Sequence, residues 1–460
     1  MKINIITLGC SKNIVDSEHI AGHLRKAGFE LFFDRTRNDC DIVIVNTCGF
    51  IGDAKEESIN VLLEQIAIKK RSRRKRRLIA VGCLIQRYEK ELREELPEID
   101  AFYGVHQWGE LVKDLIELSP FTFHLSPFTF QERMQSTPKH YAYLKISEGC
   151  NRTCSYCAIP LIRGKHVSRP IEDILDEAKR MVADGVKELI IIAQDTTYYG
   201  LDLYNKRMLG TLLDRLATEI TLPTDASATS HLSSFTSHLP WIRLHYTYPA
   251  SFPDDAIDAI ARHPNICNYI DIPLQHINSR LLKSMQRGID REGTLALLDR
   301  FRQKLPDAAI RTTLIVGYPG ETAEDFEELK DFVRQARFDR MGCFAYSPEE
   351  GTPAEHLGDP IPDEEKQRRV SELMALQEQI SLEKNQARIG RTFRCIVDRI
   401  EGEHIIARTE YDSPEVDDEV LIPTNTLTPS RITHISTGDF VSVLITDALE
   451  NDLIGEITNP

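Results

Sequence analysis

Six short apolar runs in the middle of this 460-residue chain alternate with stretches of mostly helical periodicity. The runs cover residues 143–146, 188–194, 242–246, 268–273, 311–317 and 339–346. Strands that alternate with helices build a parallel sheet, because each helix carries the chain back to the start of the next strand. We therefore predict an α/β fold with a partial barrel of about six βα units, whose ligands bind at the carboxyl ends of the strands.

Several polar residues directly follow these apolar runs. They are Gln194-Asp195, His245, Gln275-His276 and residues 317–321. Because the carboxyl ends of parallel strands meet at one edge of the sheet, we expect these residues to line a common site.

Three cysteines, Cys150, Cys154 and Cys157, follow the first of these runs with the spacing C-x3-C-x2-C. Three thiolates in one loop can ligate three irons of a cubane 4Fe-4S cluster, and the sequence has no fourth cysteine close by to complete the usual set. One iron then stays open to another ligand. Zinc is the alternative, but zinc sites usually combine paired C-x2-C or Cys/His sets, and His166 is the only nearby histidine.

Three strand-like runs in the first 85 residues each end on a cysteine: Cys10, Cys48 and Cys83. In an open parallel sheet such strand ends lie on one edge, so the three thiols can converge and share a second cluster. The alternative for each is a small buried apolar residue, a common role of free cysteine. The other cysteines show no such pattern and are assigned to packing: Cys40, Cys267, Cys343 and Cys395.

The formal net charge of −15 argues against a protein that coats nucleic acid, because phosphate binding depends on clustered Lys and Arg. The length and the 41% apolar content suit about two to four domains. No run approaches the ~20 apolar residues that span a bilayer, and the first residues lack a signal-peptide layout. These features predict a cytoplasmic protein with no membrane association.

One basic run, residues 69–77, contrasts with this acidic composition. It is either a solvated helix end and loop or a contact for RNA, a ribosome or an acidic redox partner. A seven-residue repeat at 119–130 is interpreted as a linker, and the Ser-, Thr- and His-rich insertion at 222–240 as a mobile surface loop.

The pattern changes near residue 389 to short alternating strands with turn residues, which predicts a small barrel of roughly five strands. The predicted organisation is an N-terminal parallel α/β domain (1–118), a linker (119–138), the partial barrel (139–362), a connecting helix (363–388) and the small β-barrel (389–460).

The C-x3-C-x2-C loop on a βα repeat resembles the radical S-adenosylmethionine superfamily. The resemblance implies that an open iron binds S-adenosylmethionine, whose reductive cleavage yields a 5′-deoxyadenosyl radical. It also implies that Cys150, Cys154 and Cys157 are the catalytic cluster ligands and that Tyr156 lies over the adenine. The residues that follow the strands then become candidate cofactor contacts: Gln194, Gln275 and Gly317.

Over nearly its whole length the chain resembles the methylthiotransferase family, whose terminal module is called TRAM. This resemblance implies two 4Fe-4S clusters, with Cys10, Cys48 and Cys83 holding the one that delivers sulfur. One molecule of S-adenosylmethionine would supply the methyl group and another the radical. An electron donor and a sulfur source are implied partners.

Two branches of that family compete, one modifying a tRNA adenosine and the other the β-carbon of an aspartate in small-subunit ribosomal protein S-twelve. Residues 389–460 hold 5 Arg, no Lys and 14 Asp plus Glu, a balance of −9 that would repel phosphate and attract a basic protein. We expect this acidic barrel, with its acidic cluster at 412–419, to recognise that protein. Residues 9–18 and 408–417 also resemble the protein-modifying branch, whereas the basic run favours tRNA. A third possibility is an iron-sulfur electron carrier without catalysis.

Overall fold

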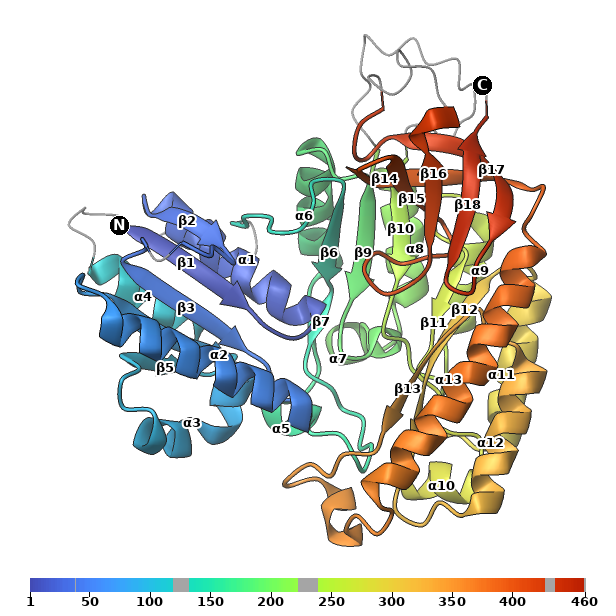
Figure 1. Ribbon diagram of the computed structural model, residues 1–460, viewed down its shortest axis with the longest axis horizontal. Helices are drawn as coiled ribbons and strands as arrows, with labels where there is room; N and C mark the ends of the chain where they lie inside the picture. The colour runs from blue at the N-terminus through green and yellow to red at the C-terminus, as the bar shows by residue number, and fades with distance from the viewer. Residues whose placement is uncertain (38, 119–131, 222–238, 427–434, 459–460) are drawn as a thin grey trace.

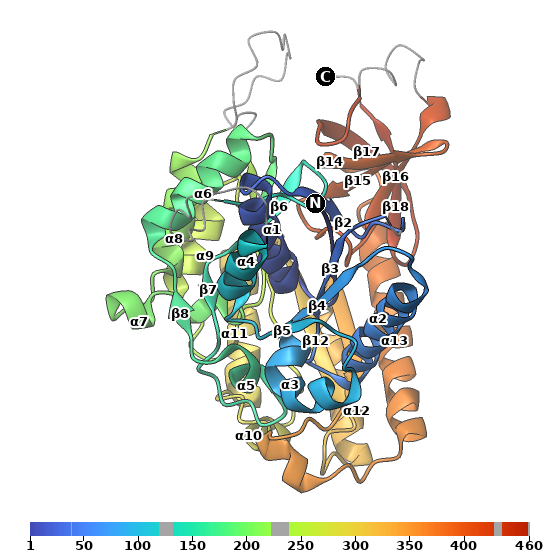
Figure 2. The same ribbon diagram turned by 90° about the vertical axis from the view of Figure 1, so that its left-hand side faces the viewer.

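Figure 1 shows a computed structural model of the chain, which describes residues 1–37, 39–118, 132–221, 239–426 and 435–458. The repeat at 119–130 and most of the insertion at 222–240 lie outside the described residues. Two views at right angles show an N-terminal α/β unit, a larger central α/β unit and a small β-barrel at one end of the central unit (Figure 2). No helix within the described ranges is long and apolar enough to cross a membrane.

The N-terminal unit is a parallel sheet in the order β2-β1-β3-β4-β5, with two helices packed on each face. Side chains of β3 alternate between the two cores, so both faces of the sheet are buried, as is typical of a parallel sheet. The two edge strands β2 and β5 were not predicted. The strands are β1 (Lys2–Thr7), β2 (Glu30–Phe33), β3 (Ile42–Thr47), β4 (Arg77–Gly82) and β5 (Ala101–Tyr103), and the helices are α1 (Ser11–Lys26), α2 (Gly52–Arg71), α3 (Cys83–Glu95) and α4 (Trp108–Glu117).

The central unit is an open arc of six parallel strands in two hydrogen-bonded sheets, β6-β9-β10 and β11-β12-β13. A single parallel bridge from Ile242 to Ile266 lies where the two sheets meet. The strands are β6 (Tyr141–Lys145), β9 (Glu188–Ile192), β10 (Trp241–Leu244), β11 (Tyr269–Asp271), β12 (Ala309–Val316) and β13 (Arg340–Ala345), all within two residues of the predicted bounds.

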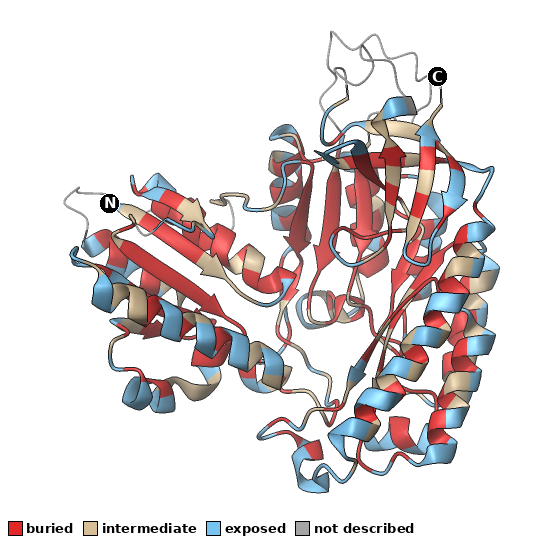
Figure 3. Ribbon diagram, in the orientation of Figure 1, coloured by how far each residue is buried: buried red, intermediate tan, exposed pale blue. Residues whose placement is uncertain are grey.

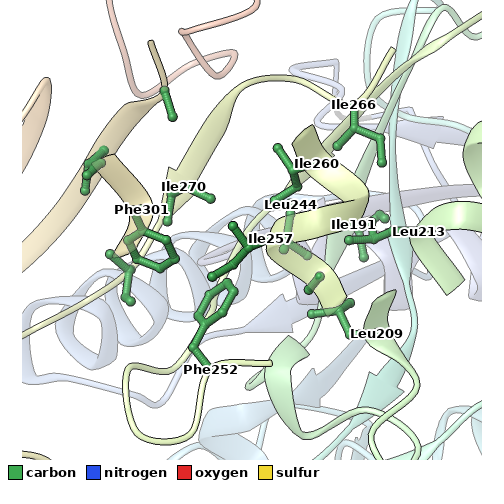
Figure 4. Close-up of a cluster of buried hydrophobic side chains, with 14 of the residues drawn as sticks. Ile191, Leu209, Leu213, Leu244, Phe252, Ile257, Ile260, Ile266, Ile270 and Phe301 are labelled. Atoms are coloured by element: carbon green, nitrogen blue, oxygen red, sulfur yellow. The ribbon is translucent and has the colours of Figure 1, made fainter. Parts of the chain in front are cut away.

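Helices cover the outside of this arc, and short elements cross its ends. Figure 4 shows part of the core, where Leu213 and Ile257 of two helices lie beside Ile191 and Leu244 of the strands, and Phe301 of a third helix lies near Ile270. The helices are α5 (Ile159–Arg163), α6 (Ile171–Ala183), α7 (Leu201–Tyr204), α8 (Leu209–Glu219), α9 (Asp254–Arg262), α10 (Ser279–Ser284), α11 (Arg291–Lys304), α12 (Ala323–Ala336) and α13 (Asp363–Gln386). The short elements are β7 (Ser147–Glu148), β8 (Val167–Ser168), η1 (Thr196–Tyr198) and η2 (Pro353–Leu357).

The C-terminal unit is a closed five-stranded barrel in the order β14-β15-β16-β18-β17. Closure leaves no free edge strand, which is how a small sheet avoids unwanted pairing. Its elements are β14 (Thr392–Glu401), β15 (His404–Thr409), β16 (Glu419–Pro423), η3 (Thr424–Thr426), β17 (Phe440–Ala448) and β18 (Asp452–Ile457). Burial is continuous from the strands of the central unit to the side of the barrel that faces them (Figure 3).

The acidic segment 412–419 of the barrel lies mainly against the central unit, not in solvent. Asp412 is 1% exposed and its Oδ1 accepts hydrogen bonds from the guanidinium of Arg340 at 2.5 and 3.1 Å. Asp417 accepts one from Nε of Arg311 at 3.2 Å, and Asp418 lies 3.0 Å from Nη2 of Arg340. The expectation that these carboxylates are free to attract a basic protein was therefore wrong for Asp412, Asp417 and Asp418, while capture by the acidic barrel stays a prediction. Buried carboxylates need partners, and here the arginines of β12 and β13 supply them.

A second buried network holds the same seam between barrel and central unit. Glu188 of β9 lies between two arginines, accepting from Nε of Arg243 at 2.7 Å and from Nη2 of Arg408 at 2.7 Å. Arg408 also pairs with Asp398 at 2.6 Å. The segment 408–417, which resembles one branch of the methylthiotransferase family, thus joins the barrel to the central unit.

Candidate active site

Cys10, Cys48 and Cys83 come together at the carboxyl edge of the N-terminal sheet. Cys10 stands between β1 and α1, Cys48 follows β3, and Cys83 opens α3 directly after β4. The helices after β1 and β3 lie on opposite faces, and such a switch between neighbouring strands is where open parallel sheets bind ligands. Burial raises the pKa of the Cys83 thiol to about 12, and the nearby thiols of Cys10 and Cys48 add to that shift.

A glycine with positive φ precedes a cysteine at three places in the two triads. Gly9 has φ 88°, Gly82 has φ 110° and Gly149 has φ 77°. A Cβ on Gly9 would lie 2.8 Å from Sγ of Cys48, and a Cβ on Gly149 would lie 2.1 Å from the carbonyl oxygen of Lys165. Only glycine allows these turns and close approaches without strain, so the glycines determine how the thiols are presented.

Cys150, Cys154 and Cys157 lie in the loop between β7 and α5. The N–H of Cys157 donates to the carbonyl oxygen of Cys154 at 3.1 Å, and the N–H of Arg152 donates to Sγ of Cys150 at 3.4 Å. Burial raises the pKa of Cys157 to about 12, and the thiols of Cys154 and Cys150 add to that effect. The three thiols are therefore electrostatic neighbours within one folded loop.

Arg287, in the loop after α10, reaches the sulfur of this second triad. Its Nη1 donates to Sγ of Cys154 at 3.3 Å and to the hydroxyl oxygen of Tyr156 at 3.2 Å. The guanidinium also lies 4.3 Å from the ring centroid of Tyr248, whose hydroxyl donates to the carbonyl oxygen of Arg287 at 2.6 Å. A fixed buried cation beside a thiolate stabilises its negative charge, so Arg287 favours the thiolate form of Cys154.

Gln194 and Gln275, which follow β9 and β11, each hold a side-chain oxygen that is buried without a hydrogen-bond donor among the described residues. The amide nitrogen of Gln194 donates to Oε1 of Glu148 at 2.5 Å. Gln275 has φ 76° and its backbone pairs with β12. A buried acceptor without a donor is costly, so both oxygens suit a ligand that brings N–H or O–H groups.

Gly317 and His245 were expected to line the common site at the strand ends, but both make contacts elsewhere. The N–H of Gly317 donates to Oε2 of Glu321 at 2.7 Å, and a Cβ there would lie 2.4 Å from Cγ of Lys366. That side of the glycine therefore packs on α13. His245 hydrogen-bonds Oγ of Ser413 at 3.0 Å and belongs to the barrel seam.

Asp195 and His276 remain in the wall of the central unit. Oδ2 of Asp195 accepts from Nε of Arg152 at 2.7 Å, and Arg152 lies 3.9 Å from the ring centroid of Tyr248. His276 is fully buried, and its Nδ1 accepts from the N–H of Asn278 at 3.0 Å. Burial lowers the pKa of His276 to about 3, so the imidazole is neutral at physiological pH.

The two cysteine triads are connected through Asn13 and Arg163. Nη2 of Arg163 donates to Oδ1 of Asn13 at 2.6 Å and to Sγ of Cys83 at 3.4 Å. Its Nη1 pairs with Asp16 at 2.7 Å and with Glu148 at 3.2 Å. Because α5 follows the C-x3-C-x2-C loop directly, this one side chain ties the central cysteine loop to the N-terminal triad.

Tyr246, directly after β10, makes a second contact between the units. Its hydroxyl lies 3.3 Å from Oγ of Ser11, and Nζ of Lys12 lies 2.7 Å from its ring centroid. Ser11 and Lys12 are the residues that follow Cys10. The first triad therefore lies beside the carboxyl end of the central strands.

A cavity of about 380 Å³ lies between the two units next to Arg163. The N-terminal unit contributes Asp16, His19 and Trp108 to its walls, among others. The central unit contributes Lys145 and Ser147, and the hydroxyl of Ser147 is buried without a partner in the described part of the chain. Among the polar side chains of its walls, basic and hydroxyl groups outnumber the two carboxylates, those of Asp16 and Glu148.

The donor sets fit iron-sulfur clusters. Within the described ranges, no three His, Cys, Asp or Glu side chains are placed to hold a single metal ion. A four-iron cluster spaces its thiolates more widely than one ion does, and each triad offers three. Burial raises the pKa of Cys48, Cys83, Cys150 and Cys157, and a bound metal supplies the positive charge that such thiols need to lose their protons.

Three residues around the cysteine triads were not predicted from the sequence: Arg163, Tyr248 and Arg287. The only local signal for Tyr248 is its position just after a strand, near Tyr246. Arg163 lies six residues after Cys157, yet nothing in the spacing tells which way an arginine of a short helix points. Arg287 had no signal at all.

Comparison with known protein families divides the chain in three. Residues 2–104 match the uncharacterized protein family UPF0004, residues 144–333 match the Radical SAM superfamily, and residues 389–458 match the TRAM domain. The two cysteine triads fall in the first two segments.

Curated relatives match nearly end to end. Proteins called ribosomal protein uS12 methylthiotransferase RimO from Flavobacterium johnsoniae and Bacteroides thetaiotaomicron are 51% and 50% identical to the chain. The first match covers 99% of the chain and 98% of the relative, and the second covers 100% and 98%. The relative of the same name from Cytophaga hutchinsonii is 46% identical, over 99% and 98%.

Among solved structures, a radical S-adenosylmethionine methyltransferase, TsrM from Kitasatospora setae, with cobalamin and a 4Fe-4S cluster bound, superposes with a TM-score of 0.56. It is 15% identical, and the match covers 82% of the chain and 90% of that protein. At this identity the likeness concerns the fold alone.

Proposed function

The chain belongs to the RimO family of ribosomal protein uS12 methylthiotransferases, radical S-adenosylmethionine enzymes, and from this we propose that it adds a methylthio group to the β-carbon of a uS12 aspartate. Protein uS12 is the small-subunit protein S-twelve. Membership in the superfamily implies two cofactors, S-adenosylmethionine and a 4Fe-4S cluster. We infer two clusters, because two separate cysteine triads are present.

Each triad has its own role in this proposal. Cys150, Cys154 and Cys157 hold the cluster that binds S-adenosylmethionine, and Cys10, Cys48 and Cys83 hold the cluster that delivers sulfur. When bound, these groups supply a carbon-centred radical, a methyl group and a sulfur atom. An aspartate β-carbon suits such a route, because its hydrogen is not acidic enough for a side-chain base to remove readily at neutral pH.

The residues around the triads position the groups and exclude water. Arg287 holds Cys154 and Tyr156 together, and the buried side-chain oxygens of Gln194 and Gln275, which lack a donor among the described residues, support these two residues as cofactor contacts. Gly317 is a weaker candidate contact, because α13 covers one side of it. Buried surroundings protect a reactive intermediate from solvent.

The observation that carries the proposal is the link through Arg163, which contacts the sulfur of Cys83 from the helix that follows Cys157. A radical at the substrate carbon must meet sulfur before it meets another hydrogen donor, so the two sites must share one space. A non-catalytic electron carrier would not need this arrangement.

The basic run at 69–77 favours the second candidate, a tRNA adenosine methylthiotransferase. The deciding experiment incubates reconstituted enzyme, reductant, a sulfide source and S-adenosylmethionine separately with uS12 and with a tRNA anticodon stem-loop. Mass spectrometry should find a methylthio adduct on the aspartate of uS12 and none on the RNA. The reverse result would select the tRNA function, and 5′-deoxyadenosine in neither reaction would favour the carrier.

A further inference from the structure

Four exposed basic side chains surround the end of α2 that is farthest from the cysteines. Arg71 ends α2, and Arg73, Arg74 and Lys75 lie in the connection to β4. None of the four makes an ion pair or a side-chain hydrogen bond within the described part of the chain. Figure 1 shows this end of α2 at the outer side of the N-terminal unit, away from the central unit. We call these four residues the basic patch.

Two acidic residues beside this end of α2, Glu98 and Asp100, are already paired with two lysines of the same basic run. Nζ of Lys69 lies 2.5 Å from Asp100 and donates to the carbonyl oxygen of Glu98. Lys70 pairs with Glu98 at 2.6 Å. In a chain with a net charge of −15, these neighbours neutralise two cations of the run and leave the basic patch without partners.

The two remaining arginines of the run do not join the patch. Arg76 is buried and donates to Oε1 of Gln65 at 3.2 Å. Arg77 opens β4 and lines a hollow that also contains Asp100 and Asp114. The run therefore separates into two ion-paired lysines, the buried Arg76, the exposed Arg77 at the start of β4, and one group of four cations that faces solvent beside the end of α2.

We propose that the basic patch is a docking surface for the phosphate backbone of RNA, namely the RNA of the small ribosomal subunit that surrounds the substrate protein. Three of its four members are arginines, whose planar guanidinium can bind a phosphate through two parallel hydrogen bonds. This inference rests on the proposed function, because only a substrate within a ribonucleoprotein presents RNA beside the aspartate.

The position of the patch favours RNA over an acidic redox protein. Helix α2 has 20 residues, so its two ends are about 30 Å apart. Its first residue, Gly52, lies on the cysteine side, four residues after Cys48, and the patch is at the other end. A redox partner on the patch would be too far from either triad for efficient electron transfer, because tunnelling falls steeply with distance. A large RNA surface can contact the patch while the substrate protein bound to it reaches the triads at the other end of α2.

The first test measures binding without catalysis. The full chain is titrated with small-subunit ribosomal RNA at several salt concentrations. Four phosphate contacts predict that the logarithm of the association constant falls with a slope of about −3 against the logarithm of the salt concentration. Between 50 and 200 mM salt the affinity then falls roughly fiftyfold. The variant Arg71→Gln, Arg73→Gln, Arg74→Gln and Lys75→Gln should bind weakly and lose most of this slope.

A matched control removes the same charge elsewhere. Its four residues are exposed cations that are already ion-paired: Lys113, Lys179, Arg334 and Arg368. Their replacement by Gln should leave the salt slope nearly unchanged. Equal losses in both variants would show that only net charge matters, and would overturn the patch as a site.

The second test compares methylthiolation of free uS12 with that of the assembled small subunit. The patch variant should lose about tenfold or more in kcat/KM on the assembled subunit and keep its rate on free uS12. If the variant matches the wild-type rate on both substrates, the proposal is overturned. It is also overturned if an acidic flavoprotein reduces the variant more slowly while RNA binding is unchanged. If neither the wild type nor the variant modifies uS12, free or assembled, the proposed function fails, while the binding test still decides the patch.

Discussion

Arg163 of the central unit donates a hydrogen bond from Nη2 to Sγ of Cys83 in the N-terminal unit, at 3.4 Å. The same nitrogen donates to Oδ1 of Asn13, and the side chain is only 3% exposed. Cationic N–H groups near cluster sulfurs are among the factors that set reduction potentials. The geometry therefore makes Arg163 a positioning residue for the first triad.

Replacing Arg163 with Gln should make the potential of the first cluster more negative by tens of millivolts, because the reduced, more negative cluster loses a cation. On the one-electron scale, 59 mV corresponds to a tenfold change in equilibrium constant. The measurement is a redox titration followed by electron paramagnetic resonance, in a chain whose Cys150, Cys154 and Cys157 are Ala. Arg163→Lys keeps the charge but loses the forked contact, so an intermediate shift is expected. An unchanged potential in the Gln variant contradicts this role.

Removing each triad should separate two steps of the reaction. With Cys150, Cys154 and Cys157 replaced by Ala, the protein should bind about half the iron and form no 5′-deoxyadenosine. With Cys10, Cys48 and Cys83 replaced, it should also lose about half the iron but still form some 5′-deoxyadenosine without methylthio transfer. Iron analysis and chromatography of the products provide the readouts. Full transfer by the second variant would disprove sulfur delivery from that triad.

Gly149→Ala should disturb the second triad through the backbone. The added Cβ would lie 2.1 Å from the carbonyl oxygen of Lys165, and φ of 77° is already unfavourable for alanine. We expect the variant to fold but bind less iron in reconstitution. Gly185→Ala is the control, because Gly185 has φ 107° but no atom within 4 Å of the new Cβ. Equal iron content in the two variants would argue against steric positioning at Gly149.

Asp418→Asn should stabilise the protein above neutral pH. Burial raises the pKa of Asp418 from 3.8 to about 7, with Asp412 adding to the shift and Arg340 opposing it. Between these values the unfolded chain loses a proton that the folded chain keeps, so stability falls as pH rises from about 4 to 7. The Asn variant has no such titration. Thermal unfolding at pH 8 should show a gain on the order of 1–2 kcal/mol that shrinks toward pH 4. A gain that does not change with pH would reject this explanation.

Asp412→Asn should have the opposite effect. Burial alone would raise the pKa of Asp412, but Arg340 and Arg388 hold it below its usual value. The ionised carboxylate therefore stabilises the fold above about pH 4, and this contribution is lost as pH falls through the lowered pKa. Breaking the buried pair should cost about 3 kcal/mol at pH 7, measured by urea denaturation. A change in uS12 capture without a change in stability would restore the surface role first expected for this segment.

Much of the architecture follows from local patterns. The alternation of apolar runs with helices predicts the six central strands, and a cysteine after each of β1, β3 and β4 predicts that three thiols lie on one edge, because strand ends of a parallel sheet coincide. The edge strands β2 and β5 were missed, since runs of four and three residues carry too little periodicity. The cysteine motifs and the order of the three units also indicate the family from the sequence alone.

The sequence by itself determined which residues can ligate iron and how the strands and helices follow one another, because both depend on residue type and spacing along the chain. Only the tertiary structure decided where charges act. Asp412 became a buried partner of Arg340, 72 residues away, and Arg163 reached Cys83, 80 residues away. The energy of a charge depends on burial and on its neighbours in space, and neither is encoded in local periodicity.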